Sequence, residues 1–150
     1  MGQLKLIHDV VITPLKRFSD ERGMVMHIMK SSDAQFKGFG EVYCSTINPG
    51  VIKGWHFHEK ITLNYVVLKG MIRFVLYDSR EDSPSKNTVQ EILLGDENYI
   101  RVTVPPGIWS AFKCLGTESA MVCNLIDLPH DDSETKRCDP FDKNIPYIWK

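Results

Sequence analysis

The sequence predicts an all-β protein, built as a sandwich or barrel of short strands. Short apolar stretches recur along the chain, and Gly, Pro, Asn and Asp interrupt them roughly every eight to twelve residues. No stretch of about a dozen residues carries apolar positions at helical spacing. The chain shows no internal repeat, low-complexity segment or linker, so residues 1–150 are expected to form a single domain.

The first strands are expected on both sides of a polar turn. Residues 4–12 are apolar enough for a strand, which Thr13-Pro14 would end. Residues 18–23 have the composition of a turn, and residues 24–29 follow as a second strand. The polar residues 31–39 are expected to form at most a single helical turn.

The remaining strands follow one another with turn signals between them. Asn48-Pro49-Gly50 ends one of them, and Lys69-Gly70 joins two others as a hairpin. These strands are expected at residues 41–47, 63–68, 71–77, 88–94, 99–104, 109–115 and 120–126. The tail from Asp127 is expected to be irregular.

Composition excludes several classes of protein. The chain is 43% hydrophobic and 25% charged, as in ordinary soluble globular proteins, and its net charge of −1 without a basic block argues against a nucleic-acid partner. The apolar runs are far shorter than the roughly 20 residues of a membrane span. The four cysteines form no CxxC pair and no export signal is visible, so a cytoplasmic location is expected.

Two histidines stand two residues apart, at His56 and His58. Side chains alternate between the faces of a strand, so these two imidazoles should point the same way. Such a pair can ligate a metal or move protons near neutral pH. The alternative is that one of them is a hydrogen-bonded core residue.

The spacing of glycines and histidines resembles the cupin double-stranded β-helix, a jelly-roll barrel. One cupin motif is matched by Gly50, the two histidines and Gly70, and the second by Gly95 and Pro105-Pro106-Gly107. Metal-binding cupins carry a glutamate and a third histidine where this chain has Leu63 and Ser110. Because a catalytic metal normally needs about three protein ligands, no metal or other cofactor is expected.

Five segments in order resemble the dTDP-4-dehydrorhamnose 3,5-epimerases, which are metal-independent cupins. These segments are residues 20–23, 53–58, 69–80, 104–112 and 138–149. The resemblance implies that His56 is a general base, that Asp139 orients it, and that Arg22 binds the nucleotide diphosphate. Lys53 stands in place of an arginine of that family, which keeps the charge but loses the bidentate fork.

Other positions depart from that family. Leu63 replaces the lysine that stabilises the enolate, Ser110 replaces a histidine, and Cys123 replaces the tyrosine that reprotonates the opposite face of the sugar. An enolate still needs donors or positive charge where it forms, and the candidates are Lys53, Lys60, Tyr65 and Ser110. His58 is a further candidate for contact with the substrate.

The function expected from the resemblance is epimerisation at C3, C5 or both of a nucleotide-linked 4-keto-6-deoxy sugar, in deoxysugar or surface polysaccharide biosynthesis. The alternatives are a ketosugar isomerase, a non-catalytic protein that binds nucleotide sugars, and a metal-dependent cupin. The resemblance also implies a homodimer in which residues 4–12 exchange as a strand and Arg22 reaches the neighbour's site. No membrane partner is expected.

Overall fold

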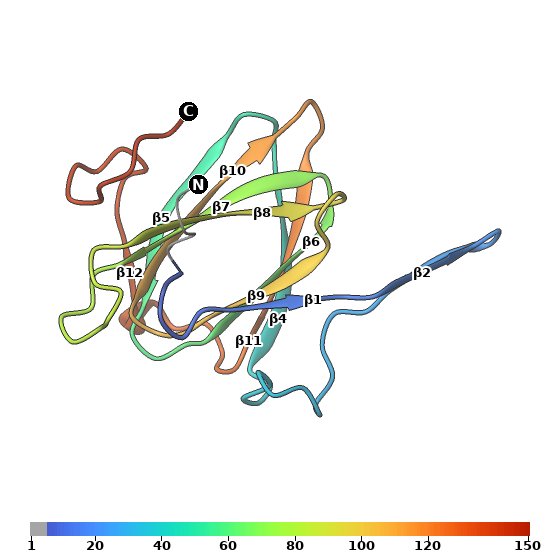
Figure 1. The fold of residues 1–150 in the computed structure, drawn as a ribbon, viewed down its shortest axis with the longest axis horizontal. Coiled ribbons are helices and arrows are strands. Elements are labelled where there is room, and N and C mark those ends of the chain that lie inside the picture. The colour runs from blue at the N-terminus through green and yellow to red at the C-terminus, as the bar shows by residue number, and fades with distance from the viewer. Residues whose placement is uncertain (1–5) are drawn as a thin grey trace.

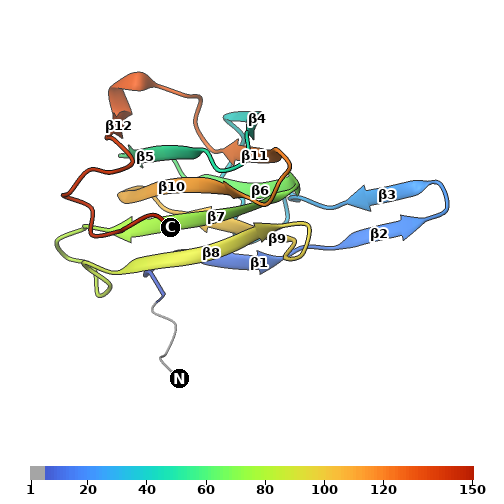
Figure 2. The ribbon, with the colours of Figure 1, turned by 90° about the horizontal axis from the view of Figure 1, so that it is seen from above.

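Two antiparallel sheets face each other in the computed structural model, which describes residues 6–150 (Figures 1 and 2). The first sheet has the order β1 (Val11–Pro14), β9 (Ile100–Val104), β6 (Leu63–Lys69), β11 (Ala120–Ile126), β4 (Glu41–Ile47). The second has the order β12 (Thr135–Arg137), β5 (Ile52–His58), β10 (Ile108–Leu115), β7 (Met71–Asp78), β8 (Val89–Gly95). This arrangement confirms the predicted all-β jelly roll.

The core lies between the two sheets. Alternate side chains of the central strands point inward, and Phe74, Leu76 and Val102 are fully buried there. A second apolar cluster lies on the other side of β5 and β7, where the chain's last residues cover Trp55 and Val75. The second sheet is therefore covered on both faces.

A hairpin of β2 (Arg17–Asp20) and β3 (Gly23–Met26) projects well beyond the two sheets (Figures 1 and 2). The predicted turn over residues 18–23 is therefore too long, because Asp20 closes a tight turn by accepting the backbone N–H of Arg22 at 2.8 Å. The predicted strand over residues 24–29 ends early, at Met26. The backbone carbonyls of residues 27 and 28 instead accept hydrogen bonds from the side chains of Tyr99, just before β9, and Arg101, within it.

The predicted N-terminal strand over residues 4–12 is wrong for residues 6–10, and residues 4 and 5 lie outside the described part of the chain. The strand begins at Val11 and includes Thr13-Pro14, which was expected to end it. Ile7 is buried, and its N–H donates to the side chain of Gln90 at 2.9 Å rather than to the backbone of a neighbouring strand. β1 then pairs with β9 of the same chain.

The tail contains order that the sequence did not predict. A 3₁₀ turn at Asp132–Glu134 leads into β12, which extends the second sheet beside β5. Within residues 6–150, no helix is long and apolar enough to cross a membrane. β12 and β4 are edge strands of the two sheets, and Figure 2 shows them with β5 on the same side of the barrel.

Candidate active site

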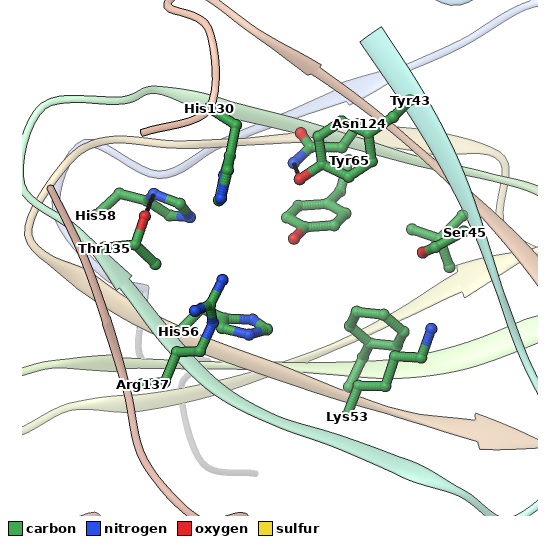
Figure 3. Close-up of a pocket in the computed structure, with 12 residues that line it drawn as sticks. Tyr43, Ser45, Lys53, His56, His58, Tyr65, Asn124, His130, Thr135 and Arg137 are labelled. Carbon is green, nitrogen blue, oxygen red and sulfur yellow. Dashed lines mark hydrogen bonds between the residues drawn. The ribbon is translucent and has the colours of Figure 1, made fainter. Parts of the chain in front are cut away.

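A cavity of about 220 Å³ lies between the two sheets (Figure 3). The second sheet and the loop before β12 supply its basic residues and one hydroxyl, that of Thr135, and the first sheet supplies the other hydroxyl groups and the amide. The lining residues are Tyr43, Ser45, Lys53, His56, His58, Tyr65, Phe112, Val122, Asn124, His130, Thr135 and Arg137. Two chemically different walls therefore face each other across one cavity.

A bulge in β5 brings its basic residues to one face. Lys53 and His56 pair with residues of β10 that are only two positions apart, so Gly54 and Trp55 together oppose Ala111. The extra residue changes the alternation, and Lys53 reaches the same cavity as His56. Trp55 points to the outer face, where it is buried.

His58 forms a tight pair with a carboxylate that the sequence did not indicate. Its Nδ1 lies 2.6 Å from Oε1 of Glu134, and both side chains are almost completely buried. Burial opposes ionisation of Glu134, but hydrogen bonds from His58, the backbone N–H of Lys60 and the hydroxyl of Thr135 lower its pKa to about 2. The carboxylate is therefore ionised at neutral pH, and Nδ1 of His58 is the donor.

His56 has different surroundings. Within residues 6–150 its ring forms no hydrogen bond or ion pair with another side chain. Burial, followed by the positive charges of Arg137 and its neighbours, lowers the pKa of His56 to about 4. This imidazole is therefore neutral at physiological pH, with both nitrogens available to a ligand.

The opposite wall presents two tyrosines (Figure 3). The Tyr43 hydroxyl accepts a hydrogen bond from Nδ2 of Asn124 at 3.0 Å, across directly paired positions of β4 and β11. Burial raises the pKa of Tyr43 and of Tyr65. Both phenols keep their protons at neutral pH and can donate them.

Four of the residues predicted for the site line this cavity: Lys53, His56, His58 and Tyr65. Five do not line it: Arg22, Lys60, Ser110, Cys123 and Asp139. Ser110 is buried, and Lys60 approaches the site only through its backbone N–H to Glu134. Arg22 lies at the tip of the projecting hairpin and pairs with Asp20.

Asp139 is not beside His56. Its neighbours on both sides are attached to Trp55: the N–H of Cys138 donates to the Trp55 carbonyl, and the Pro140 carbonyl accepts from Trp55 Nε1. This segment therefore crosses the outer face of the second sheet. The exposed Asp139 carboxylate caps a turn by accepting the N–H of Phe141 at 2.8 Å.

Cys123 also lies away from the cavity. Val122 and Asn124 line the cavity, so the residue between them points to the opposite face of β11. Cys123 stands directly across from Cys44 of β4, and burial with that neighbouring thiol raises its pKa to about 12. It has neither the position nor the acidity of a proton donor to this cavity.

The prediction missed several lining residues. The alternation within β4 and β11 was a usable signal for Tyr43 and Asn124, because it sorts their side chains by face. The polar stretch that leads into and forms β12 carries no such periodicity, and it supplies His130, Thr135 and Arg137 as well as Glu134. Within the described residues, no three side chains of the types that bind metals are grouped as ligands.

A jelly roll with an inward-facing His-x-His pair is the architecture of a cupin. The model of the family described as dTDP-4-dehydrorhamnose 3,5-epimerase matches residues 5–150. The chain belongs to this family of isomerases, which confirms the resemblance expected from its sequence.

Individual relatives agree with this assignment. The chain is 32% identical over 143 residues to the probable low-salt glycan biosynthesis epimerase Agl13 of Haloferax volcanii, which covers 94% of this chain and 88% of the relative. It is 25% identical to the TDP-4-oxo-6-deoxy-alpha-D-glucose-3,4-oxoisomerase of Aneurinibacillus thermoaerophilus, over 89% of this chain and 90% of the relative. A crystal structure of a dTDP sugar isomerase from Desulfovibrio desulfuricans superposes with a TM-score of 0.93, at 33% identity and over 95% and 92% of the two chains.

Proposed function

We propose that this protein epimerises C3, C5 or both of a nucleotide-linked 4-keto-6-deoxy sugar. The observation that carries the proposal is the cavity, in which imidazoles on one sheet face phenols on the other. Inverting a carbon takes a base on one side of the sugar ring and a proton donor on the other. The names of two relatives support this proposal: one is a probable epimerase of glycan biosynthesis, and the other an isomerase of a nucleotide-linked 4-oxo-6-deoxy sugar.

The reaction begins at the weakly acidic C–H bond next to the ketone. A cavity histidine, His56 or His58, takes that proton, and the electron pair of the bond moves into an enolate. The enolate oxygen is stabilised by the positive charges of Lys53 and Arg137, which line the same wall. A phenol on the opposite wall then delivers a proton to the other side of the carbon.

Tyr43 is the donor best supported by its surroundings. Asn124 donates to the Tyr43 oxygen and so fixes the phenol while leaving its O–H free for the ligand. Tyr65 is buried more deeply, and the centroid of its ring lies 4.7 Å from that of the Phe74 ring. Tyr43→Phe should therefore stop inversion, whereas Cys123→Ser, offered as the matched control, should leave it unchanged.

A ketosugar isomerase is the second candidate, because both strand histidines lie on the same wall. Moving a proton between neighbouring carbons on one side of the ring needs no donor on the other side. Under this alternative, Tyr43→Phe would leave turnover intact while removal of both histidines abolished it. The name of the Aneurinibacillus relative gives this alternative a precedent.

The proposal includes a homodimer, supported by the projecting hairpin. Phe18, Met24 and Val25 are exposed on it, and Arg22 at its tip is 83% exposed. A partner subunit would cover these apolar groups and receive Arg22 near its nucleotide. Light scattering should give a dimer at micromolar concentration, and a stable monomer would contradict this part of the proposal. The cytoplasmic location stays a prediction.

The function is tested by incubating the protein with dTDP-4-keto-6-deoxyglucose in deuterated water. Proton NMR should show deuterium entering next to the ketone, followed by inverted product. Exchange no faster than in buffer, for this and other nucleotide ketosugars, would overturn the proposal.

A further inference from the structure

We propose that His58, positioned by Glu134, is the group that removes the proton from the sugar, in the place that the sequence resemblance gave to His56 and Asp139. The proposal rests on the proposed function, because it assigns the base of that same reaction. It names one catalytic residue, His58, and one positioning residue, Glu134.

The geometry of His58 is that of an oriented base. Its Nδ1–H donates to Oε1 of Glu134 at 2.6 Å, which leaves Nε2 without a proton in the neutral ring. The edge of the ring that carries Nε2 points into the cavity (Figure 3). The lone pair that accepts a substrate proton is therefore directed at the place where the sugar must lie.

Glu134 is itself held in a fixed position. Oε2 accepts the backbone N–H of Lys60 at 3.1 Å, and Oε1 also accepts the hydroxyl of Thr135 at 2.8 Å. The backbone N–H of Glu134 donates to Asp131 at the start of the 3₁₀ turn, which fixes its place along the chain. A carboxylate held by these two donors stabilises the imidazolium of His58 as it forms and needs no rearrangement during the reaction.

His56 lacks this support. The side chains around its ring are cationic or can become so, and they include Arg137, His130 and Lys53. A positive charge formed on His56 would be repelled by these groups and would have no carboxylate beside it. Its neutral ring suits a hydrogen bond to a sugar oxygen, so this assignment gives His56 a role in binding.

The step balances without an added reactant. The C–H bond breaks, its electron pair moves into the enolate, and its proton becomes Nε2–H of His58, while the Nδ1 proton stays on His58 and remains hydrogen-bonded to Glu134. After the opposite face is reprotonated, His58 loses the acquired proton to solvent and regains its starting form. The phenol that reprotonates the carbon is restored by a proton from solvent. In deuterated water it carries deuterium, so the deuterium in the product comes from this group.

The experiment compares Glu134→Gln with Asp139→Asn, two substitutions that each replace a carboxylate by an amide. Glu134→Gln keeps the size and shape of the side chain but only one acceptor oxygen, so either the N–H of Lys60 or the Thr135 and His58 side loses its acceptor, and circular dichroism checks that the variant is folded. We expect kcat for deuterium exchange to fall by about 10²- to 10⁴-fold in Glu134→Gln with little change in KM. Asp139→Asn should stay within about twofold of wild type, and Glu134→Asp should recover part of the lost rate.

Nitrogen NMR of the histidine rings gives a readout that does not depend on substrate. In the wild type His58 should be the Nδ1–H tautomer, and Glu134→Gln should shift it toward the other tautomer without unfolding the protein. Full kcat in Glu134→Gln, or a large loss confined to Asp139→Asn, would overturn the assignment. Wild type that shows no exchange would overturn the proposed function and this base with it, whereas an active wild type with an unaffected Glu134→Gln would overturn only the base.

Discussion

The two faces of β5 have different chemistry. The inner face carries Lys53, His56 and His58 into a polar cavity, whereas Trp55 on the outer face is sealed beneath Tyr147 and Trp149. The C-terminal stretch serves both faces in turn: β12 lies along the edge and the following residues cross the outside. Glu134 precedes β12 and meets His58 on the inner face, whereas Asp139 follows β12 and lies on the outer face.

Removing the buried side chain of the outer face should have the largest effect on stability. Trp55→Ala deletes a ring that is 1% exposed and breaks its hydrogen bond to Pro140, so it should cost about 3–5 kcal/mol of unfolding free energy. Urea unfolding followed by circular dichroism measures this cost. Phe141→Ala, in the same tail but 69% exposed, is the control and should stay within about 0.5 kcal/mol. Equal effects of the two variants would show that the outer face is not packed as described.

On the inner face, the burial of His56 should make the free energy of unfolding depend on pH. The pKa of His56 is lowered from 6.5 to about 4 in the folded protein, so the unfolded chain binds a proton more readily. Folded-state stability from this residue is therefore complete above about pH 6.5 and is lost as the pH falls toward 4, by at most about 3 kcal/mol. The difference in unfolding free energy between wild type and His56→Gln should shrink over that interval. A constant difference from pH 7 to pH 4 would mean that His56 is not buried among cations.

How far the sequence predicts this molecule depends on the range of the interactions involved. Strands such as β7 were predicted closely, because alternation and turn residues are local properties of the chain. β12 is three polar residues whose strand character comes only from pairing with β5. No local pattern distinguishes such a segment from a loop.

The candidate site shows the same division. The His-x-His spacing correctly placed His56 and His58 on one face, but Glu134 is 76 residues away from His58 in sequence, and no motif joins them. Cys123 was misplaced by matching motifs in order, because an offset of a single residue in a strand moves a side chain to the opposite face. Asp139 was assigned to His56 from the resemblance, which matches positions along the chain but does not say on which side of the sheet the segment lies.

A smaller effect is expected where the tail crosses β5. A Cβ atom at Gly54 would lie 2.6 Å from the Pro140 ring and 2.9 Å from its backbone nitrogen, so the tail must shift if Gly54 is replaced. Gly54→Ala should cost about 1–3 kcal/mol through this overpacking. It should also increase the quenching of Trp149 fluorescence by a soluble quencher, because the indole N–H of Trp149 donates a hydrogen bond to the Pro140 carbonyl. An unchanged quenching profile would indicate that the tail does not depend on this contact.

The smallest effect should come from replacing Asp139. This substitution tests whether Asp139 acts at the cavity on the inner face or only caps a turn on the outer face. Its carboxylate caps the N–H of Phe141, just as Asp142 caps the N–H of Asn144, both at 2.8 Å. Asp139→Ala and Asp142→Ala should therefore behave alike, each costing within about 1 kcal/mol of stability and leaving kcat for deuterium exchange unchanged.

The comparison of these two variants is informative because they remove the same interaction from neighbouring turns. If Asp139 oriented His56 during the reaction, Asp139→Ala would lower kcat while Asp142→Ala did not. Equal kcat values would leave Asp139 on the outer face, where it only terminates a turn. They would also leave Glu134 as the one carboxylate, among the described residues, that bonds to an imidazole of the β5 His-x-His pair.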